Sequence, residues 1–335
     1  SGPLATYRNG PVSSNVRPHM TKISALRQKH EPALLSITEA GFEAALVRAA
    51  FDNLEVSGPL CFNNFGYAIR ELLRHVFHRL APDEQIKQCP WFKPDPTSRS
   101  TITRADRSKY MLQGGLSDYF VDKILEVKVP PVIEAVSAAF ETLNKFTHIN
   151  PETFNLKEVD AASRAAECLE ATSSLIGNIA TCRSAVLQNL SAAIDQHLLE
   201  ESISDVISEL DEIATHYLID EVYTDSSEIV DIGPKDLCIE VEGNIGVELQ
   251  YGSSSDVRND IGTVVSDSFP FSATVKVAFT RPLGKKAKVS NFKVNTSSWY
   301  GKCGLTIRST GPIAAGGQKP AISFWAFSRL PQRAG

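Results

Sequence analysis

Apolar and polar side chains recur with a helical period over most of the first two hundred residues, and the period is clearest over residues 64–81. At about 100° per residue, the apolar positions of this stretch fall on one side of a helix: Ile69, Leu72, Leu73, Val76, Phe77 and Leu80. The opposite side carries charged and imidazole groups: Arg70, Glu71, Arg74, His75, His78 and Arg79. Asn64 can cap the helix, and Pro82 ends it because a proline ring cannot continue the hydrogen-bond ladder. The pattern predicts an amphipathic helix with one strongly polar face.

The same period predicts helices on both sides of this stretch. The helix before it has an apolar face made of Phe42, Leu46, Ala49 and Ala50. After it, Thr103 caps a short helix, and Pro130 opens a longer one that ends near His148. Over residues 156–213 the apolar spacing indicates two or three long antiparallel helices, with Gly177 marking a kink or a break.

Near residue 214 the period changes from helical to alternating. Residues 237–241 form a strand, residues 242–244 a turn, and residues 245–251 the next strand. Later runs also alternate, at residues 270–279, 289–294 and 322–327. Short alternating runs separated by Gly, Asn, Asp and Ser are typical of a small antiparallel sandwich or barrel.

The sequence therefore predicts an α+β fold. A helical N-terminal domain is expected over residues 20–213, and a small antiparallel β sandwich or barrel domain over residues 214–335. Residues 1–19 lack any period and are rich in Ser, Pro, Asn and Gly, so they are expected to be a tag or a disordered segment.

Charge is distributed unevenly along the chain. Residues 1–110 carry 15 Lys and Arg against 10 Asp and Glu, residues 111–228 carry 6 against 21, and residues 229–335 carry 13 against 8. Because phosphates are repelled by like charge, a polyanion is expected to bind the first or the last of these segments and not the acidic middle.

Two further features bear on location. No run approaches the roughly 18 apolar residues that a membrane helix needs. The six cysteines are scattered, without a C-x-x-C pair. These features predict a cytoplasmic protein with reduced, structural thiols, no membrane partner and no zinc site.

Candidate catalytic residues lie on the polar face of the central helix. Arg70 and His75 fit the R-x4–6-H pattern of HEPN-type ribonucleases, in which a histidine acts as base or acid and an arginine stabilises the phosphorane. Five residues correspond to about 140° around a helix, so Arg74 and His78, four residues apart, converge better. His148 is expected to lie next to them when the helices pack, although the helix dipole alone explains a C-terminal histidine. A solvated charged face explains the other residues equally.

A second basic group follows an aromatic, proline-rich loop. Arg104 and Arg107 lie one turn apart on the short capped helix, with Lys109 nearby, and such a group can clamp phosphates. The structural alternative is that these are ordinary surface side chains.

Acidic residues of the β region allow a different interpretation. Glu240, Glu248, Asp256 and Asp260 could form the divalent-metal cluster of a restriction-enzyme-like nuclease. The usual acidic-x-lysine ending is absent, because Leu249 and Gln250 follow Glu248. Loop structure or ligand binding is the alternative role. The chain contains no Walker motif, dinucleotide fingerprint, zinc spacing or nucleophile elbow, so no cofactor and no bound metal are expected.

Several segments resemble bacterial proteins described as predicted pPIWI-associating nucleases. The resembling segments of the helical part are residues 67–82, 89–92, 103–107, 113–115 and 146–148, and those of the β part are residues 247–253, 255–256 and 267–271. This resemblance implies a role in conflict with phages or plasmids, and hence a partner protein from a defence system.

Three hypotheses follow. The first is a defence-associated effector with a HEPN-like helical domain that acts on RNA without a metal, through Arg70, Arg74, His75, His78 and His148, with a homodimer as a possible way to complete the site. The second is a non-catalytic sensor or adaptor that binds nucleic acid or a nucleotide on the same face. The third is a metal-dependent DNA nuclease with its acids in the β domain.

Overall fold

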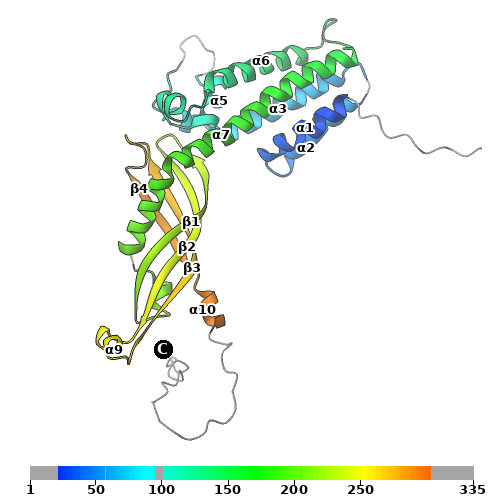
Figure 1. Ribbon diagram of the computed structural model, residues 1–335. Helices are drawn as coiled ribbons and strands as arrows, with labels where there is room; N and C mark the ends of the chain where they lie inside the picture. Colours follow the sequence, from blue (N-terminus) through cyan, green and yellow to red (C-terminus); the bar gives the residue numbers. More distant parts are fainter. Residues whose placement is uncertain (1–21, 57, 95–100, 205, 303–335) are drawn as a thin grey trace, which may run out of the picture. The chain divides into compact units, whose positions relative to one another are not determined.

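The computed structural model describes residues 22–56, 58–94, 101–204 and 206–302, in which helices precede strands (Figure 1). The helical segments before the sheet are α1 (Lys22–Ser36), α2 (Phe42–Glu55), α3 (Cys61–Leu80), α4 (Asp83–Ile86), α5 (Arg104–Gln113), the π-helix η1 (Phe120–Ile124), α6 (Val129–Thr147), α7 (Glu158–Ser204) and α8 (Ser208–Asp211). The strands are β1 (His216–Ile232), β2 (Asp236–Tyr251), β3 (Thr263–Ala278) and β4 (Ala287–Val294), with α9 (Ser254–Arg258) before β3 and α10 (Ser297–Lys302) after β4.

The predicted α+β class is confirmed. The four strands form one antiparallel sheet in the order β1-β2-β3-β4, and the sheet is not closed into a barrel. Alternate residues of β2 are buried, among them Leu237, Ile239, Val241, Ile245 and Val247, because this side of the sheet forms part of the core. Helix α7 packs against β1 and β4 and supplies the second layer.

Helix α3 has the predicted polarity. Ile69, Leu72, Leu73, Val76 and Phe77 are all buried. The helix packs between α2 and α6, and pairs of aromatic rings join it to α6 at both ends, Phe62 to Phe146 with centroids 4.8 Å apart and Phe77 to Phe140 at 5.5 Å. These pairs run in opposite order along the two helices, so α3 and α6 are antiparallel.

The apolar face predicted for α2 is right only at Ala50. The buried apolar residues are Val47, Ala50, Phe51 and Leu54, whereas Phe42 is 62% exposed. The observed residues follow the spacing i, i+3, i+4, i+7, and Phe42 stands on the first turn, away from this stripe.

Most of the segment predicted as two or three antiparallel helices is one helix, α7, of 47 residues, and among the described residues up to 213 only the four-residue α8 follows it. At 1.5 Å per residue α7 is about 70 Å long. Gly177 does not break it, because one glycine costs a helix only about 1 kcal/mol. Figure 1 shows α7 running from the other helices onto the sheet, and its buried residues Cys182, Val186, Leu190 and Ile194 continue at four-residue spacing over the sheet.

Strand β2 is also continuous where the sequence predicts a turn. A Cβ on Gly243 would lie 2.0 Å from the backbone oxygen of Tyr223, so glycine is required here for close approach of β1 and not for a turn. Strand β1 is irregular at the same level, with a register shift between Thr224 and Ser226.

The predicted division at residue 214 stays a prediction. The helices α1–α9 and the sheet lie within one compact unit that ends at Asn295, and a second unit begins at Thr296. The strand expected at residues 322–327 and the tag expected at residues 1–19 lie outside the described residues. None of the helices in the described ranges is both long enough and apolar enough to span a membrane.

Candidate functional site

The polar face of α3 is open to solvent between α2 and α6. Tyr67, Glu71, Arg74 and His78 follow at i, i+4, i+7 and i+11, so they lie within about 60° of one another around the helix. Tyr67, Arg74 and His78 are exposed, and Glu71 is half-buried. These four residues are called the α3 stripe below.

Glu71 organises the two arginines of this face. Its carboxylate accepts hydrogen bonds from Arg70 Nη2 and from Arg74 Nε, both at 2.8 Å. Arg70 Nη1 also donates to Thr147 Oγ1 on α6 at 3.0 Å. The hydrogen bonds from Arg74 and Arg70 lower the pKa of the Glu71 carboxyl, so it is charged at neutral pH. Both guanidinium groups are therefore held in fixed positions by one counter-charge.

The side of the α3 stripe next to α2 carries a second histidine. Arg74 Nη2 lies 3.1 Å from His75 Nε2, and the ring of Phe42 meets the His75 ring edge-on at 5.2 Å. One turn further, Arg79 donates to Glu43 Oε2 at 2.7 Å and to the backbone oxygen of Ile37. Arg79 thus joins α3 to the start of α2, whereas Arg74 stays largely exposed.

His78 is the histidine best placed to accept a proton. Partial desolvation and the positive charge of Arg107 lower its pKa, and the carboxylate of Asp83 opposes them only in part. Arg74 and His75 also lower the pKa by their charge. The exposed imidazole of His78 is therefore unprotonated at pH 7.

The structure does not bring His148 to His78. Asn63 Nδ2 donates to the backbone oxygen of Phe146 at 2.8 Å, so the end of α6 lies beside the first turn of α3. His78 stands fifteen residues beyond Asn63, which is about 22 Å along the helix. The neighbour of the end of α6 on the polar face is Arg70, through Thr147.

The second basic group is divided between core and surface. Arg107 is buried and donates to the backbone oxygen of Ala81 and to the carboxylate of Asp83, so it holds α5 against the end of α3. Arg104 is exposed, and its guanidinium carbon lies 4.7 Å from the centroid of the Phe140 ring. Of these two arginines, only Arg104 presents its charge to solvent.

Lys109 lies between an aromatic ring and an acid. Its ammonium group is 4.5 Å from the centroid of the Trp91 ring and 2.8 Å from Asp118 Oδ1. The loop after α5 is fixed nearby, since Trp91 Nε1 donates to the backbone oxygen of Gly114 at 2.6 Å. The predicted cap at Thr103 is present as a capping box with Asp106.

The acids of the β region do not converge. Glu240 and Glu248 lie on the same side of β2 but eight residues apart, which is about 26 Å along a strand. Asp256 instead accepts a hydrogen bond from the backbone of Ser253 and caps α9. Within the described part of the chain, no three His, Cys, Asp or Glu side chains are grouped so that they could hold a metal ion.

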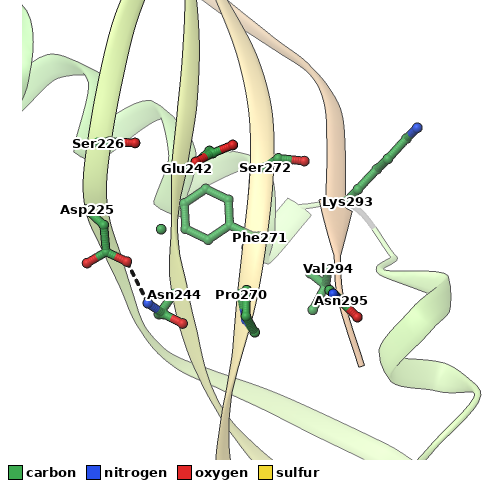
Figure 2. A pocket seen from close by; sticks show the side chains of 11 residues that line it. Asp225, Ser226, Glu242, Asn244, Pro270, Phe271, Ser272, Lys293, Val294 and Asn295 are labelled. Atoms are coloured by element: carbon green, nitrogen blue, oxygen red, sulfur yellow. Dashed lines mark hydrogen bonds between the residues drawn. The ribbon is translucent and has the colours of Figure 1, made fainter. Parts of the chain in front are cut away.

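A shallow hollow of about 470 Å³, which no sequence pattern predicts, lies on the sheet (Figure 2). All four strands and the residue after β4 line it: Asp225, Ser226, Glu242, Gly243, Asn244, Pro270, Phe271, Ser272, Lys293, Val294 and Asn295. Asn244 donates to Asp225 Oδ2 at 2.6 Å across β1 and β2. Carboxylates come from β1 and β2, and an ammonium group comes from β4.

Sequence reasoning also missed the aromatic residues of the α3 stripe and its border. Phe42 was expected in the core and Tyr67 was given no role, yet they are 62% and 57% exposed. The signal for Tyr67 was its place in the same i, i+4, i+7, i+11 series as Arg74 and His78. For Phe42 the sequence held no signal, because its neighbour His75 belongs to another helix.

Comparison with known families gives two matches. One family model matches residues 35–172, which include α3 and α5, and another matches residues 179–300, which include the sheet. Both are described as predicted pPIWI-associating nuclease. Comparisons with curated proteins and with solved structures found no match. The two family matches span most of the chain, and the chain belongs to the family of predicted pPIWI-associating nucleases.

Proposed function

We propose that the chain is an effector nuclease that cleaves RNA by metal-independent acid–base chemistry on α3. The observation that carries this proposal is an exposed histidine of lowered pKa, His78, in one stripe with the exposed Arg74. An imidazole that is unprotonated at pH 7 can accept a proton, and a guanidinium can stabilise charge that develops on a phosphate.

RNA suits this pair because its ribose carries its own nucleophile. His78 takes the proton of the 2′-hydroxyl, and the 2′-oxygen forms a bond to the adjacent phosphorus while Arg74 stabilises the phosphorane. The bond from phosphorus to the 5′-oxygen then breaks, and His78, which now carries the proton of the 2′-hydroxyl, gives this oxygen a proton, while His75, beside Arg74, lines the same surface. The products are a 2′,3′-cyclic phosphate and a 5′-hydroxyl.

The remaining basic residues have supporting roles in this proposal. Arg70 extends the phosphate-binding surface along α3, and Arg104 and Lys109 extend it onto α5. His148 joins such a site only across a homodimer, because within one chain it lies at the other end of α3.

A cellular role in defence against phages or plasmids completes the proposal. The family description names an association with pPIWI, which supports a partner protein of that kind. The expected location is the cytoplasm.

Cleavage assays test the chemistry. Single strands of RNA and DNA of one sequence are incubated with the full chain, with and without EDTA. We expect RNA cleavage that resists EDTA and leaves a cyclic phosphate, and a loss of about 10²- to 10⁴-fold in rate for His78→Ala. His216→Ala is the matched control, since His216 is an exposed histidine on β1. His148→Ala should match this control if one chain forms the site.

Two results would overturn the proposal. EDTA-sensitive cleavage of DNA that persists in His78→Ala would point to metal-dependent chemistry elsewhere in the chain. Equal rates of RNA cleavage for His78→Ala and His216→Ala would show that the α3 stripe takes no part in the reaction.

A non-catalytic sensor or adaptor is the second candidate function. The observation that favours it is that Arg70, Arg74, Arg79 and Arg107 each bind a carboxylate of the chain itself. Internal ion pairs organise this face, and binding of nucleic acid without cleavage would be enough to explain it. Tight binding of nucleic acid without cleavage under any of the above conditions would support it.

A further inference from the structure

Exposed aromatic rings accompany the cations of α3 and take no part in the proposed reaction. Their role is inferred here on one assumption of the proposed function, namely that the ligand is nucleic acid. We infer that this ligand is single-stranded and that two of its bases stack on Tyr67 and Phe42.

Tyr67 is the first of the two rings. It belongs to the α3 stripe and is 57% exposed, although an aromatic ring of this size is usually withdrawn from water. The guanidinium carbon of Arg70 lies 5.5 Å from the centroid of the ring. An open ring beside a guanidinium offers a base a stacking surface and offers its phosphate a positive charge.

Phe42 is the second ring. It is 62% exposed on the first turn of α2, and its edge-on contact with His75 at 5.2 Å fixes its position. Arg74 Nη2 lies 3.1 Å from Nε2 of the same histidine, and the Arg74 side chain is 54% exposed. The same combination of open ring and guanidinium is therefore repeated, now between two helices.

The two combinations follow the axis of α3. Tyr67 and His75, the partner of Phe42, are eight residues apart, which is about 12 Å along the helix. Arg70 and Arg74 lie between them, held by Glu71. A strand that runs along α3 would thus meet a ring, two guanidinium groups and a second ring in succession.

This arrangement selects single strands. The faces of bases in a duplex are covered by their neighbours, whereas unpaired bases can turn out and stack on side chains. Since every base has such a face, the surface is expected to bind single strands with little regard to sequence. A base placed at the Tyr67 end also leaves the strand passing over Arg74 and His78.

The test is a binding measurement that does not depend on cleavage. A fluorescein-labelled 12-mer with 2′-O-methyl riboses, which lacks the nucleophile, is titrated with the full chain, and anisotropy is compared with that of the matching duplex. We expect tighter binding of the single strand, and a loss of about 5- to 100-fold in affinity for Tyr67→Ala and for Phe42→Ala. Tyr67→Phe should bind as the wild type does, because the ring and not the hydroxyl is used.

Tyr119→Ala is the matched control, since Tyr119 is an exposed tyrosine, 67%, outside α3. A second readout is 2-aminopurine placed in the strand, whose fluorescence should be quenched by the wild type and recover in Tyr67→Ala. Equal binding of duplex and single strand, no binding of either, or equal affinities for Tyr67→Ala, Phe42→Ala and Tyr119→Ala would each overturn the inference.

The failures of the two proposals are distinguishable. If RNA is bound and the aromatic variants weaken binding, but no RNA is cleaved, the inference stands and the catalytic proposal falls. If RNA is cleaved in a manner that needs His78, but the aromatic variants bind normally, the catalytic proposal stands and the inference falls.

Discussion

His30 Nδ1 lies 2.8 Å from Ser173 Oγ, so a buried imidazole joins α1 to α7 inside the helical part of the molecule. Burial and the charge of Lys29 lower the pKa of His30, and the nearby carboxylate of Glu170 opposes them only in part. The folded chain therefore holds this histidine in its neutral form, and the packing of the two helices depends on that form.

We expect the free energy of unfolding to decrease as the pH is lowered through the range in which His30 titrates. Because the pKa is lower in the folded chain than its ordinary value of 6.5, the unfolded chain binds the proton first. The contribution is complete above pH 6.5 and is lost as the pH falls below it. Urea unfolding at pH 7.5 and pH 5.5 should show a smaller loss for His30→Gln than for the wild type. An equal loss in both would contradict this account of His30.

Glu71 offers a test of the electrostatics of the α3 stripe. Its carboxylate neutralises Arg70 and Arg74 and would repel a phosphate backbone. Glu71→Gln should raise affinity for a single-stranded oligonucleotide several-fold and steepen the dependence of affinity on salt, because more counterions are released. The measurement is the affinity, from fluorescence anisotropy, at several salt concentrations between about 50 and 200 mM, which gives the slope of log affinity against log salt concentration. Weaker binding by Glu71→Gln would show that the carboxylate is needed to position the arginines.

Arg107 and Arg104 should respond differently to the same change. Arg107→Ala leaves the backbone oxygen of Ala81 and the carboxylate of Asp83 without their donor, so the free energy of unfolding should fall by about 1–3 kcal/mol. Arg104→Ala removes an exposed guanidinium and should change stability by less than about 0.5 kcal/mol, but lower affinity for nucleic acid. Thermal unfolding and anisotropy on both variants check this. A stable Arg107→Ala with weakened binding would reverse the assignment.

Substitution of Gly115, after α5, and of Gly177, within α7, by alanine should have opposite effects on stability. A Cβ on Gly115 would lie 1.9 Å from the backbone oxygen of Pro234, in the turn between β1 and β2. Gly115→Ala should therefore destabilise the fold, because backbone would have to move, whereas a Cβ on Gly177 meets nothing within 4 Å. Gly177→Ala should stabilise α7 by about 0.5–1 kcal/mol. The denaturant concentrations at the unfolding midpoints of both variants test this prediction. A lower midpoint for Gly177→Ala than for the wild type would mean that α7 is interrupted at Gly177.

The parts of the fold that sequence could predict are those in which one period dominates. The inner side of α3 is an example, since Ile69, Leu72 and Val76 leave no alternative arrangement. The turn expected at residues 242–244 was wrong because Gly243 is required by the close approach of strand β1, which a local sequence pattern does not reveal. The single helix α7 was missed for a similar reason, as packing on the sheet outweighs one unfavourable glycine.

The site divides in the same way. Its residues on α3 follow from helical geometry alone, so the alignment of Arg74 with His78 could be foreseen. The contacts of Thr147 with Arg70 and of Phe42 with His75 join different helices, and no local pattern encodes them. The position of His148 was misjudged because the direction in which α6 crosses α3 depends on tertiary packing.

The continuity of α7 has a practical consequence for dissecting the protein. A fragment that stops before β1 would keep Val186, Leu190 and Ile194 on a helix with no sheet to cover them, and such a fragment is expected to aggregate. A fragment that starts at β1 would lack the layer on which its own apolar side rests. Truncation near residue 214, where the sequence predicts a domain boundary, therefore separates two halves of one hydrophobic core. Activity is best assigned by substitutions in the intact chain.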